Sequence, residues 1–150
     1  MQIVLYQPRI PPNTGSIARL CAATQTPLNL VGPLGFSLDN KHLKRAGLDY
    51  WSHVTVNVWD NWDAFSAELN SEARLVMTSA RQGVCYVDHS FQENDYLVFG
   101  PETWGLTENI ISRGHALIRI PIWGQVRSLN LANAVAVVLY EGCRQMNKLK

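Results

Sequence analysis

The feature that most constrains this chain is a regular alternation between short apolar runs and segments of helical length. The runs are rich in β-branched and aromatic residues, as strands are, and they fall at residues 3–6, 28–31, 54–58, 75–77, 96–99 and 116–120. Segments long enough for helices lie at residues 14–25, 40–48, 62–69, 107–113 and 128–146. This alternation predicts an α/β fold, in which a mostly parallel six-stranded sheet is flanked by helices.

The length and the composition predict one globular domain. A chain of 150 residues has the length of an ordinary domain, and 47% of its residues are hydrophobic against 17% charged, which is enough for a layered core. No internal repeat, low-complexity tract or linker divides the sequence. We therefore expect a single domain over residues 1–150.

Cysteine usage, hydropathy and charge narrow the class of protein further. No apolar run approaches the roughly 20 residues of a membrane-spanning helix, and the first residues lack a charged leader. Cys21, Cys85 and Cys143 are odd in number and far apart, which argues against a disulfide framework or a zinc site. We expect a cytoplasmic protein without membrane contact. Its formal net charge is only +1, so affinity for nucleic acid would have to come from local basic clusters.

The last helical segment lacks a polar face in its first half. Nearly every residue between positions 129 and 139 is apolar. A helix of this kind is expected to be buried all round. It either crosses the centre of the domain or meets a partner subunit, and the pattern alone leaves both interpretations open.

Three segments place polar side chains at strand ends, and residues 11–19 are the first of them. A strand is followed there by the start of a helix, whose free N–H groups are suited to bind a phosphate or another anion. Arg19 lies more than one turn into that helix. The simpler interpretation is a strand-to-helix turn capped by Asn13 or Thr14, with Arg19 on a solvated face. Chemistry alone favours this simpler interpretation.

The second segment, residues 97–106, places the carboxylate of Glu102 directly after a strand, between Gly100 and Gly105. Glycine lets the backbone approach a ligand closely. Glu102 is therefore suited to accept a hydrogen bond from a substrate hydroxyl or to hold an arginine, and a loop salt bridge is the structural alternative. The position at a strand end slightly favours a functional role.

The third segment, residues 120–133, runs from a strand through a polar turn into the apolar helix. Ser128 is a natural helix cap. Asn130 and Asn133 lie three residues apart, and amides in so apolar a segment need hydrogen-bond partners. A cap and a satisfied core amide explain them without a ligand. Open parallel sheets form their ligand crevice at the carboxyl ends of the strands, so we expect the site there.

Other common activities lack their usual residues. The absence of a G-x-G-x-x-G sequence argues against a nucleotide-dependent dehydrogenase, and P-loop and H-E-x-x-H sequences are missing too. Cys21 stands among apolar helical residues and is expected in the core. Neither a metal cluster nor a nucleophilic triad is predicted, because the histidines are scattered singly at His42, His53, His89 and His115.

A set of basic residues is a candidate rim for RNA, although a solvated surface is the commoner explanation of such a pattern. The set comprises Arg9, Arg19, Lys41, Lys44, Arg45 and Arg127.

Taken in order, the three segments resemble the three sequence motifs of SPOUT methyltransferases, and the chain resembles the TrmL family within that superfamily from about residue 2 to residue 145. The stretches that carry the likeness are Ile10-Pro11-Pro12-Asn13-Thr14-Gly15, Arg45-Ala46-Gly47-Leu48-Asp49-Tyr50, Phe99-Gly100-Pro101-Glu102-Thr103 and Ser128-Leu129-Asn130-Leu131. The resemblance implies a SPOUT fold with a C-terminal deep trefoil knot and a homodimer that needs no metal. It also implies methyl transfer from S-adenosylmethionine to the ribose 2′-hydroxyl of the wobble nucleotide of tRNA, a cytidine or modified uridine at position 34.

The resemblance also implies which residues form the site. It places the cofactor, S-adenosylmethionine, against Met77, Thr78, Gly100, Ile120, Ser128 and Leu129, mostly through main-chain groups. It makes Arg19 the catalytic arginine and surrounds it with Asn13, Glu102, Ser128 and Asn130. A guanidinium whose pKa exceeds roughly 12 is a poor proton acceptor. We therefore expect Arg19 to bind the substrate phosphate and to orient the ribose.

One residue departs from the family pattern. Trp104 stands in the second motif where a basic residue is more usual, so a phosphate contact is replaced by a ring on which a base can stack. The sequence leaves open which tRNA is the substrate, which group accepts the proton and whether a helper protein or a prior modification is needed. The rival hypotheses are a catalytically silent RNA-binding dimer of the same fold and a 2′-O-methyltransferase acting on another tRNA or rRNA position.

Overall fold

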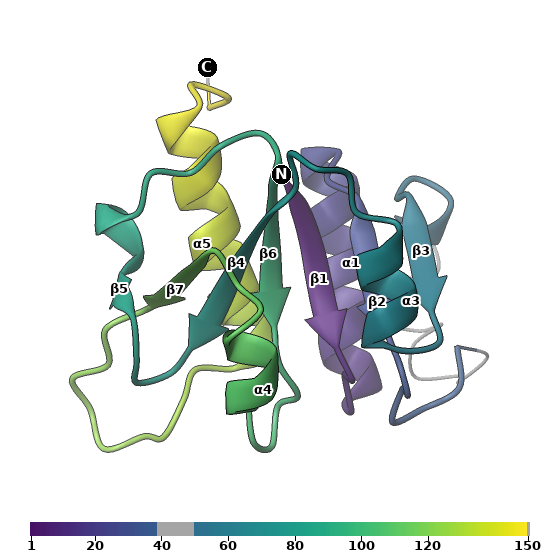
Figure 1. The fold of residues 1–150 in the computed structure, drawn as a ribbon, viewed down its shortest axis with the longest axis horizontal. Helices are drawn as coiled ribbons and strands as arrows, with labels where there is room; N and C mark the ends of the chain where they lie inside the picture. The colour runs from purple at the N-terminus through teal and green to yellow at the C-terminus, as the bar shows by residue number, and fades with distance from the viewer. Residues whose placement is uncertain (39–49, 150) are drawn as a thin grey trace.

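The sheet at the centre of the protein is parallel throughout, as the alternation predicted. The structure, a computed structural model, describes residues 1–38 and 50–149, and within them the sheet has seven strands in the order β3-β2-β1-β6-β4-β7-β5 (Figure 1). The strands are β1 (Gln2–Tyr6), β2 (Leu28–Val31), β3 (Val56–Trp59), β4 (Arg74–Ser79), β5 (Val84–Cys85), β6 (Asp95–Phe99) and β7 (Ala116–Arg119). All six predicted strands are confirmed. The prediction of six strands in total is wrong, because β5 has two residues and is too short for a periodic pattern.

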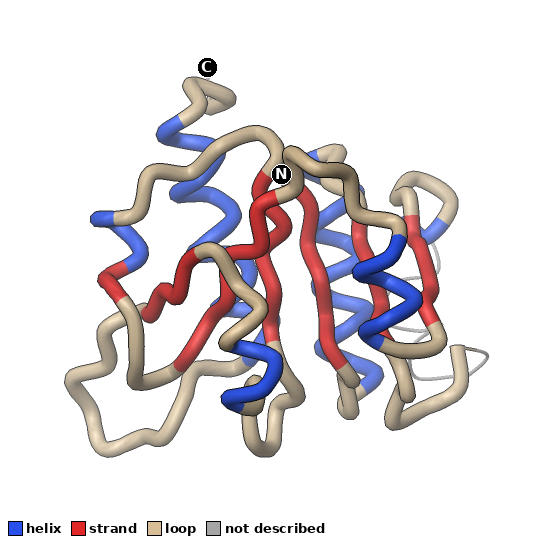
Figure 2. The backbone as a smooth tube through the Cα atoms, in the orientation of Figure 1, coloured by secondary structure: helices blue, strands red, loops and turns tan. Residues whose placement is uncertain are grey.

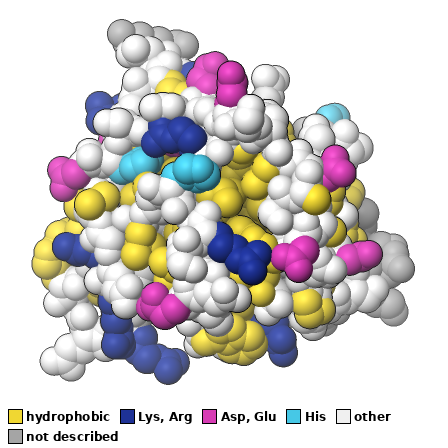
Figure 3. Space-filling model, viewed as in Figure 1, with side chains coloured by type: hydrophobic (Ala, Val, Ile, Leu, Met, Phe, Trp, Pro, Cys, Tyr) yellow, Lys and Arg dark blue, Asp and Glu magenta, His cyan; other side chains and the backbone are white. Residues whose placement is uncertain are grey.

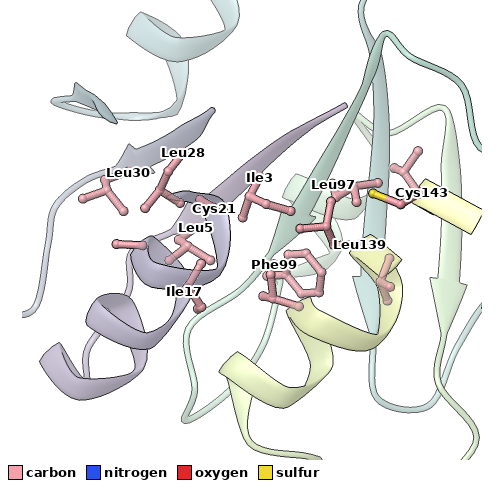
Figure 4. Close-up of a cluster of buried hydrophobic side chains, with 14 of the residues drawn as sticks. Ile3, Leu5, Ile17, Cys21, Leu28, Leu30, Leu97, Phe99, Leu139 and Cys143 are labelled. Carbon is pink, nitrogen blue, oxygen red and sulfur yellow. The ribbon is translucent and has the colours of Figure 1, made fainter. Parts of the chain in front are cut away.

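Helices cover both faces of the sheet, and side-chain alternation along the strands separates two cores (Figure 2). Ile3 and Leu5 of β1 belong to the core beneath α1 (Pro11–Thr24) and α5 (Leu131–Gln145), which Figure 4 shows at close range. Val4, between them, belongs to the core beneath α3 (Trp62–Ala67) and α4 (Glu108–Ile111). The predicted helix at residues 40–48 lies outside the described residues.

Two helix starts differ from the sequence prediction. Helix α1 begins at Pro11 rather than Thr14, since a proline in the first turn needs no N–H partner and has a helical φ. Its cap is Ile10, so neither Asn13 nor Thr14 caps it. Helix α5 is capped by Asn130, whose side-chain oxygen accepts hydrogen bonds from the backbone N–H groups of Ala132 and Asn133. The prediction of Ser128 as the cap is therefore wrong.

Helix α5 is not buried all round in the described chain. Its inner face carries Val135, Val138 and Leu139, which are almost fully buried, while Val137 and Tyr140 are 37% and 46% exposed. The helix packs on one face of the sheet beside α1 rather than crossing the centre of the domain (Figure 1). Of the two interpretations of its apolar sequence, the first is therefore wrong.

The strand order places the topological switch point of the sheet between β1 and β6. These neighbours are parallel and in register, with Leu5 opposite Phe99 near their carboxyl ends. The chain leaves β1 for α1 on one face, whereas it leaves β6 for α4 on the other. Open α/β sheets bind ligands where neighbouring strands diverge in this way. The fold thus brings the first two predicted motifs together at one edge.

Candidate active site

A cavity of about 390 Å³ opens at the carboxyl ends of β4, β6 and β7. Its wall is made by the ends of these strands and the segments that follow them, and by the start of α5. The lining residues are 78–82, 99–106, 118–120, 122, 127–129, Leu131, Ala134 and Val138. The second and third motifs therefore share one cavity, although residues 107–119 separate them in the sequence. Its volume falls within the roughly 300–1,000 Å³ that small-molecule sites have.

Most of the residues predicted to hold the cofactor line this cavity. Thr78, Gly100, Ile120, Ser128 and Leu129 all belong to its wall. The hydroxyl of Thr78 donates to the carbonyl oxygen of Val98 at 2.9 Å, so towards a ligand it can act only as an acceptor.

Met77 is the exception among the predicted cofactor residues. Its side chain is fully buried in the core beneath α3 and α4 and does not line the cavity. It packs against Gly114, where a Cβ atom would lie 2.4 Å from the Met77 side chain. The structure thus gives Met77 a place in the core under the site.

The loop after β6 is folded back so tightly that only glycine fits at two of its positions. A Cβ atom on Gly100 would lie 2.4 Å from the carbonyl carbon of Gly105, and Gly105 itself has φ of +73°. The N–H of Gly105 closes the turn by donating to Pro101 O at 2.8 Å. The backbone of residues 100–105 is held in one shape beside the cavity.

Glu102 joins this loop to the start of α1. Its carboxylate accepts hydrogen bonds from the backbone N–H groups of Arg9 at 2.8 Å and Ile10 at 3.1 Å, and from the side-chain amide of Asn13 at 3.2 Å. Of the two interpretations of this segment, the simple turn was favoured, yet the turn does receive an anion, the Glu102 carboxylate. The donors are the N–H groups of Arg9 and Ile10, because Pro11 and Pro12 at the start of α1 have none. Glu102 forms none of the ion pairs found among the described residues.

Two asparagines extend this network from α1 to α5. The amide of Asn130 donates to Asn13 Oδ1 at 2.9 Å. The oxygen of Asn130 accepts from the N–H groups of Ala132 and Asn133 and so caps α5. Asn13, Glu102 and Asn130, predicted from three different motifs, therefore form one hydrogen-bonded chain.

Arg19 lies apart from this chain. It is exposed, six residues beyond Asn13 on α1, which corresponds to about 9 Å along the helix axis. Its guanidinium carbon lies 4.8 Å from the centre of the Tyr50 ring, a cation–π distance. Arg19 does not line the cavity either, so the structure places its side chain outside both the network and the cavity.

Arginines surround the cavity on several sides. Arg81, Arg119 and Arg127 line it, and Arg119 Nε donates to Gly83 O at 3.1 Å. Figure 3 shows basic side chains along the lower edge of the visible face, the edge at which the strands end in Figure 1. Of the basic rim proposed from sequence, Lys41, Lys44 and Arg45 lie outside the described residues. A cavity with this lining favours a ligand that carries negative charge.

Arg81 and Arg119 were missed by sequence reasoning. Both stand at or just after the carboxyl end of a parallel strand, β4 or β7, and that position was the available signal. The partnership of Arg9 with Trp104, whose ring centre lies 5.2 Å from the guanidinium carbon, has no sequence signal because 95 positions separate the two residues.

Cysteine and metal chemistry find no support in the described part of the chain. Burial raises the pKa of the Cys21 thiol to about 12, in agreement with its predicted place in the core, and all three cysteines are free. Among residues 1–38 and 50–149, no group of three or more His, Cys, Asp or Glu side chains is placed to hold a metal ion. No helix in the same ranges has both the length and the apolarity that a membrane span requires.

A parallel sheet, helices on both faces and a cavity at the strand ends define an α/β protein whose candidate ligand site lies at the carboxyl ends of β4, β6 and β7. Comparison with known proteins identifies the family within this class. Residues 1–140 match the model of the SpoU rRNA Methylase family, and the chain belongs to that family.

Several similar proteins have nearly the same length as this chain. The tRNA (cytidine(34)-2′-O)-methyltransferase of Methylovorus glucosotrophus (strain SIP3-4) is 51% identical over 148 residues, which span 95% of this chain and 94% of that protein. The Yersinia pestis protein of the same name is 46% identical, with 97% and 94% covered.

Two solved structures illustrate the structural likeness. One, described as giving structural insights into the 2-OH methylation of C/U34 on tRNA, has a TM-score of 0.94 and 48% identity, covering 98% of this chain and 96% of its own. The other, an AdoMet-bound rRNA methyltransferase from Sinorhizobium meliloti, has a TM-score of 0.87 and 26% identity, covering 97% of this chain and 56% of its own.

Proposed function

We propose that this protein transfers the methyl group of S-adenosylmethionine to the ribose 2′-hydroxyl of nucleotide 34, a cytidine or modified uridine, in tRNA. One observation carries the proposal: residues from the two family motifs that follow β6 and β7 line a single cavity at the strand ends. Proteins of the same length that bear the name of this activity are up to 51% identical to the chain.

The cavity fits the cofactor in size and in the type of groups it offers. Gly100 presents backbone rather than a side chain, and Thr78, Ile120 and Leu129 add main-chain groups beside apolar surface. Main-chain donors and acceptors can recognise an adenine ring while apolar side chains cover its faces. Arg81, Arg119 and Arg127 supply cations for the cofactor's carboxylate. When bound, S-adenosylmethionine supplies an electrophilic methyl group.

The chain's own residues position the substrate for this transfer. We assign Arg19 to the substrate phosphate and ribose, because its planar guanidinium makes two parallel hydrogen bonds and keeps its proton at neutral pH. Correct orientation of a hydroxyl towards the methyl group can lower the barrier by roughly 7–11 kcal/mol. Asn13, Glu102 and Asn130 hold the starts of α1 and α5 against the loop after β6, and through α1 they place Arg19.

Glu102 acts in this proposal as a positioning residue rather than a substrate ligand. Both of its oxygens already accept bonds from groups of the chain, Oε2 from Arg9 and Oε1 from Ile10 and Asn13. Ser128 is exposed on the cavity wall and, with Arg127, is a polar residue of the third motif that remains available to a ligand.

Three further properties belong to the proposal. We expect one domain over residues 1–150, a cytoplasmic location in keeping with three free cysteines, and a homodimer. We also expect the C-terminal deep trefoil knot. The segment 120–130, which would thread it, runs beside the loop 79–83 on the wall of the cavity before α5 begins.

The test of the proposed function is methylation of purified tRNA with labelled S-adenosylmethionine, followed by mass spectrometry of total tRNA from cells with and without the gene. We expect 2′-O-methylation at nucleotide 34 that depends on the protein. Binding of RNA without methyl transfer, by a well-folded sample that binds the cofactor, would support the silent RNA-binding dimer instead. Methylation at another tRNA position or of rRNA would support the remaining rival.

A further inference from the structure

Arg9 and Trp104 form a cation–π pair beside the cavity. The guanidinium carbon lies 5.2 Å from the centre of the indole ring, and Trp104 belongs to the cavity wall. Trp104 is nevertheless 56% exposed. A large aromatic ring that lines a cavity and remains open to solvent has free surface for a ligand.

The exposure of Trp104 is imposed by the turn that carries it. Trp104 immediately precedes Gly105, whose φ of +73° and bond to Pro101 O close the loop. Gly100 touches Gly105 so closely that no side chain fits between them. The ring is thus presented by a tight loop rather than by a mobile one.

Arg9 is held in place from two sides. Its backbone N–H donates to Glu102 Oε2 at 2.8 Å, and its side-chain stem lies against Gly35, where a Cβ atom would come within 2.8 Å of the Arg9 Cδ atom. Within residues 1–38 and 50–149, the guanidinium forms no ion pair with a carboxylate. A held cation without a counter-charge, next to an open aromatic ring, offers the two groups that a nucleotide requires.

We propose that Arg9 and Trp104 bind one nucleotide of the RNA substrate, with the indole stacked on its base and the guanidinium on its phosphate. The inference rests on the proposed function and adds to it a specificity-determining element. Glu102 connects Arg9 to Asn13 and Asn130, so the bound nucleotide lies in a defined relation to the network at the start of α1 and α5. The pair positions RNA and takes no part in the chemical step.

Binding and kinetics of three variants test this inference. Trp104→Leu should raise the Kd and KM for tRNA roughly 5- to 150-fold, the range associated with the loss of one stacked base. Trp104→Phe keeps an aromatic face and should retain most of the affinity. Arg9→Gln should reduce the dependence of log Kd on log salt by roughly 0.7–0.9, the slope of one phosphate contact.

Lys148→Gln is the matched control for charge. Lys148 follows α5 and pairs at 3.3 Å with Glu93, just before the amino end of β6 and so at the end of the sheet opposite the cavity. Its loss should leave both the affinity for tRNA and the salt dependence unchanged. Thermal unfolding and calorimetry with S-adenosylhomocysteine establish that each variant is folded and binds the demethylated cofactor.

The outcomes separate this inference from the proposed function. Unchanged tRNA affinity in folded Trp104→Leu and Arg9→Gln proteins overturns the inference, and the pair is then structural. Loss of cofactor affinity in Trp104→Leu with unchanged RNA affinity also overturns it, because the ring then belongs to the cofactor pocket. The proposed function fails by a different result, the absence of methyl transfer to tRNA by the unmodified protein.

Discussion

At the scale of single residues, Glu102 shows how a sequence can single out a position without revealing its partners. Its place after a strand and between glycines marked it as important, and the sequence suggested a substrate hydroxyl or an arginine as its partner. The structure gives it the backbone N–H groups of Arg9 and Ile10. Backbone donors carry no sequence signature, so no pattern of side chains predicts such a partnership.

Glu102→Gln should destabilise the fold and lower methylation together. An amide in place of the carboxylate loses the charge that strengthens three hydrogen bonds and turns an NH₂ group towards donors, a change that costs about 1–3 kcal/mol in the free energy of unfolding. Urea titration measures this loss. Glu108→Gln, the same chemical change on an exposed residue of α4, should stay within about 0.5 kcal/mol of the unmodified protein. Equal stability of the two variants would contradict the role of Glu102.

Arg19 is the residue whose substitution should act on the substrate and not on the cofactor. Arg19→Ala should abolish methylation and spare cofactor affinity, because Arg19 is exposed and does not line the cavity. Arg19→Lys should rescue little, since an ammonium group keeps the charge but lacks the planar, two-pronged geometry. Near-normal turnover by the lysine variant would falsify the orienting role. Loss of cofactor binding in the alanine variant would place Arg19 in the other half of the site.

At the scale of secondary-structure elements, strands were predicted better than helix ends. Strand runs such as residues 28–31 are recognised by apolar composition, which burial on both faces requires. Helix starts depend on single capping contacts, and these involve distant parts of the chain: the start of α1 is held by Glu102, and Asn130 at the start of α5 is held by Asn13. Five of the six predicted cofactor residues line the cavity and Met77 does not, because strand ends converge while side-chain direction alternates along β4.

His89, which lies between η1 (Tyr86–Asp88) and β6, should make the free energy of unfolding depend on pH. Burial lowers the pKa of His89 below its usual 6.5, the charge of Asp95 opposes this shift, and the charge of Arg74 adds to it. The imidazole lies 3.6 Å from the buried Asp95 carboxylate and packs on Phe91. His89 thus favours its neutral form in the folded state.

The sign of the effect follows from proton binding. The unfolded chain takes up the proton at a higher pH than the folded chain, so stability is complete above about pH 6.5 and falls as the pH drops through the lowered pKa of His89. Urea unfolding between pH 7.5 and pH 5 should show this decline, and His89→Gln should flatten it. His53→Gln, at an exposed position, should not. An unchanged slope in the His89 variant would assign the pH dependence to other groups.

At the scale of the whole molecule, packing within the described chain explains only part of the apolar sequence of α5. Packing on the sheet explains Val135, Val138 and Leu139, but it does not explain Val137 and Tyr140 on the outward face. These two residues stand three apart and so adjoin on the helix surface. A second subunit that covers this face would account for the outward apolar residues that packing within the single chain does not explain.

Val137→Lys should therefore convert the protein from a dimer to a monomer. A lysine at the centre of an apolar interface would lose water without gaining a partner, which opposes association. Sedimentation at micromolar concentration measures the change, and methylation should fall with it if the two subunits share one tRNA. Val58→Lys provides the matched control, because Val58 is an equally small apolar residue, 51% exposed on β3, away from α5. It should leave the dimer intact. A monomeric unmodified protein that still methylates tRNA would overturn both the dimer and the shared substrate, and the outward face of α5 would then need another partner.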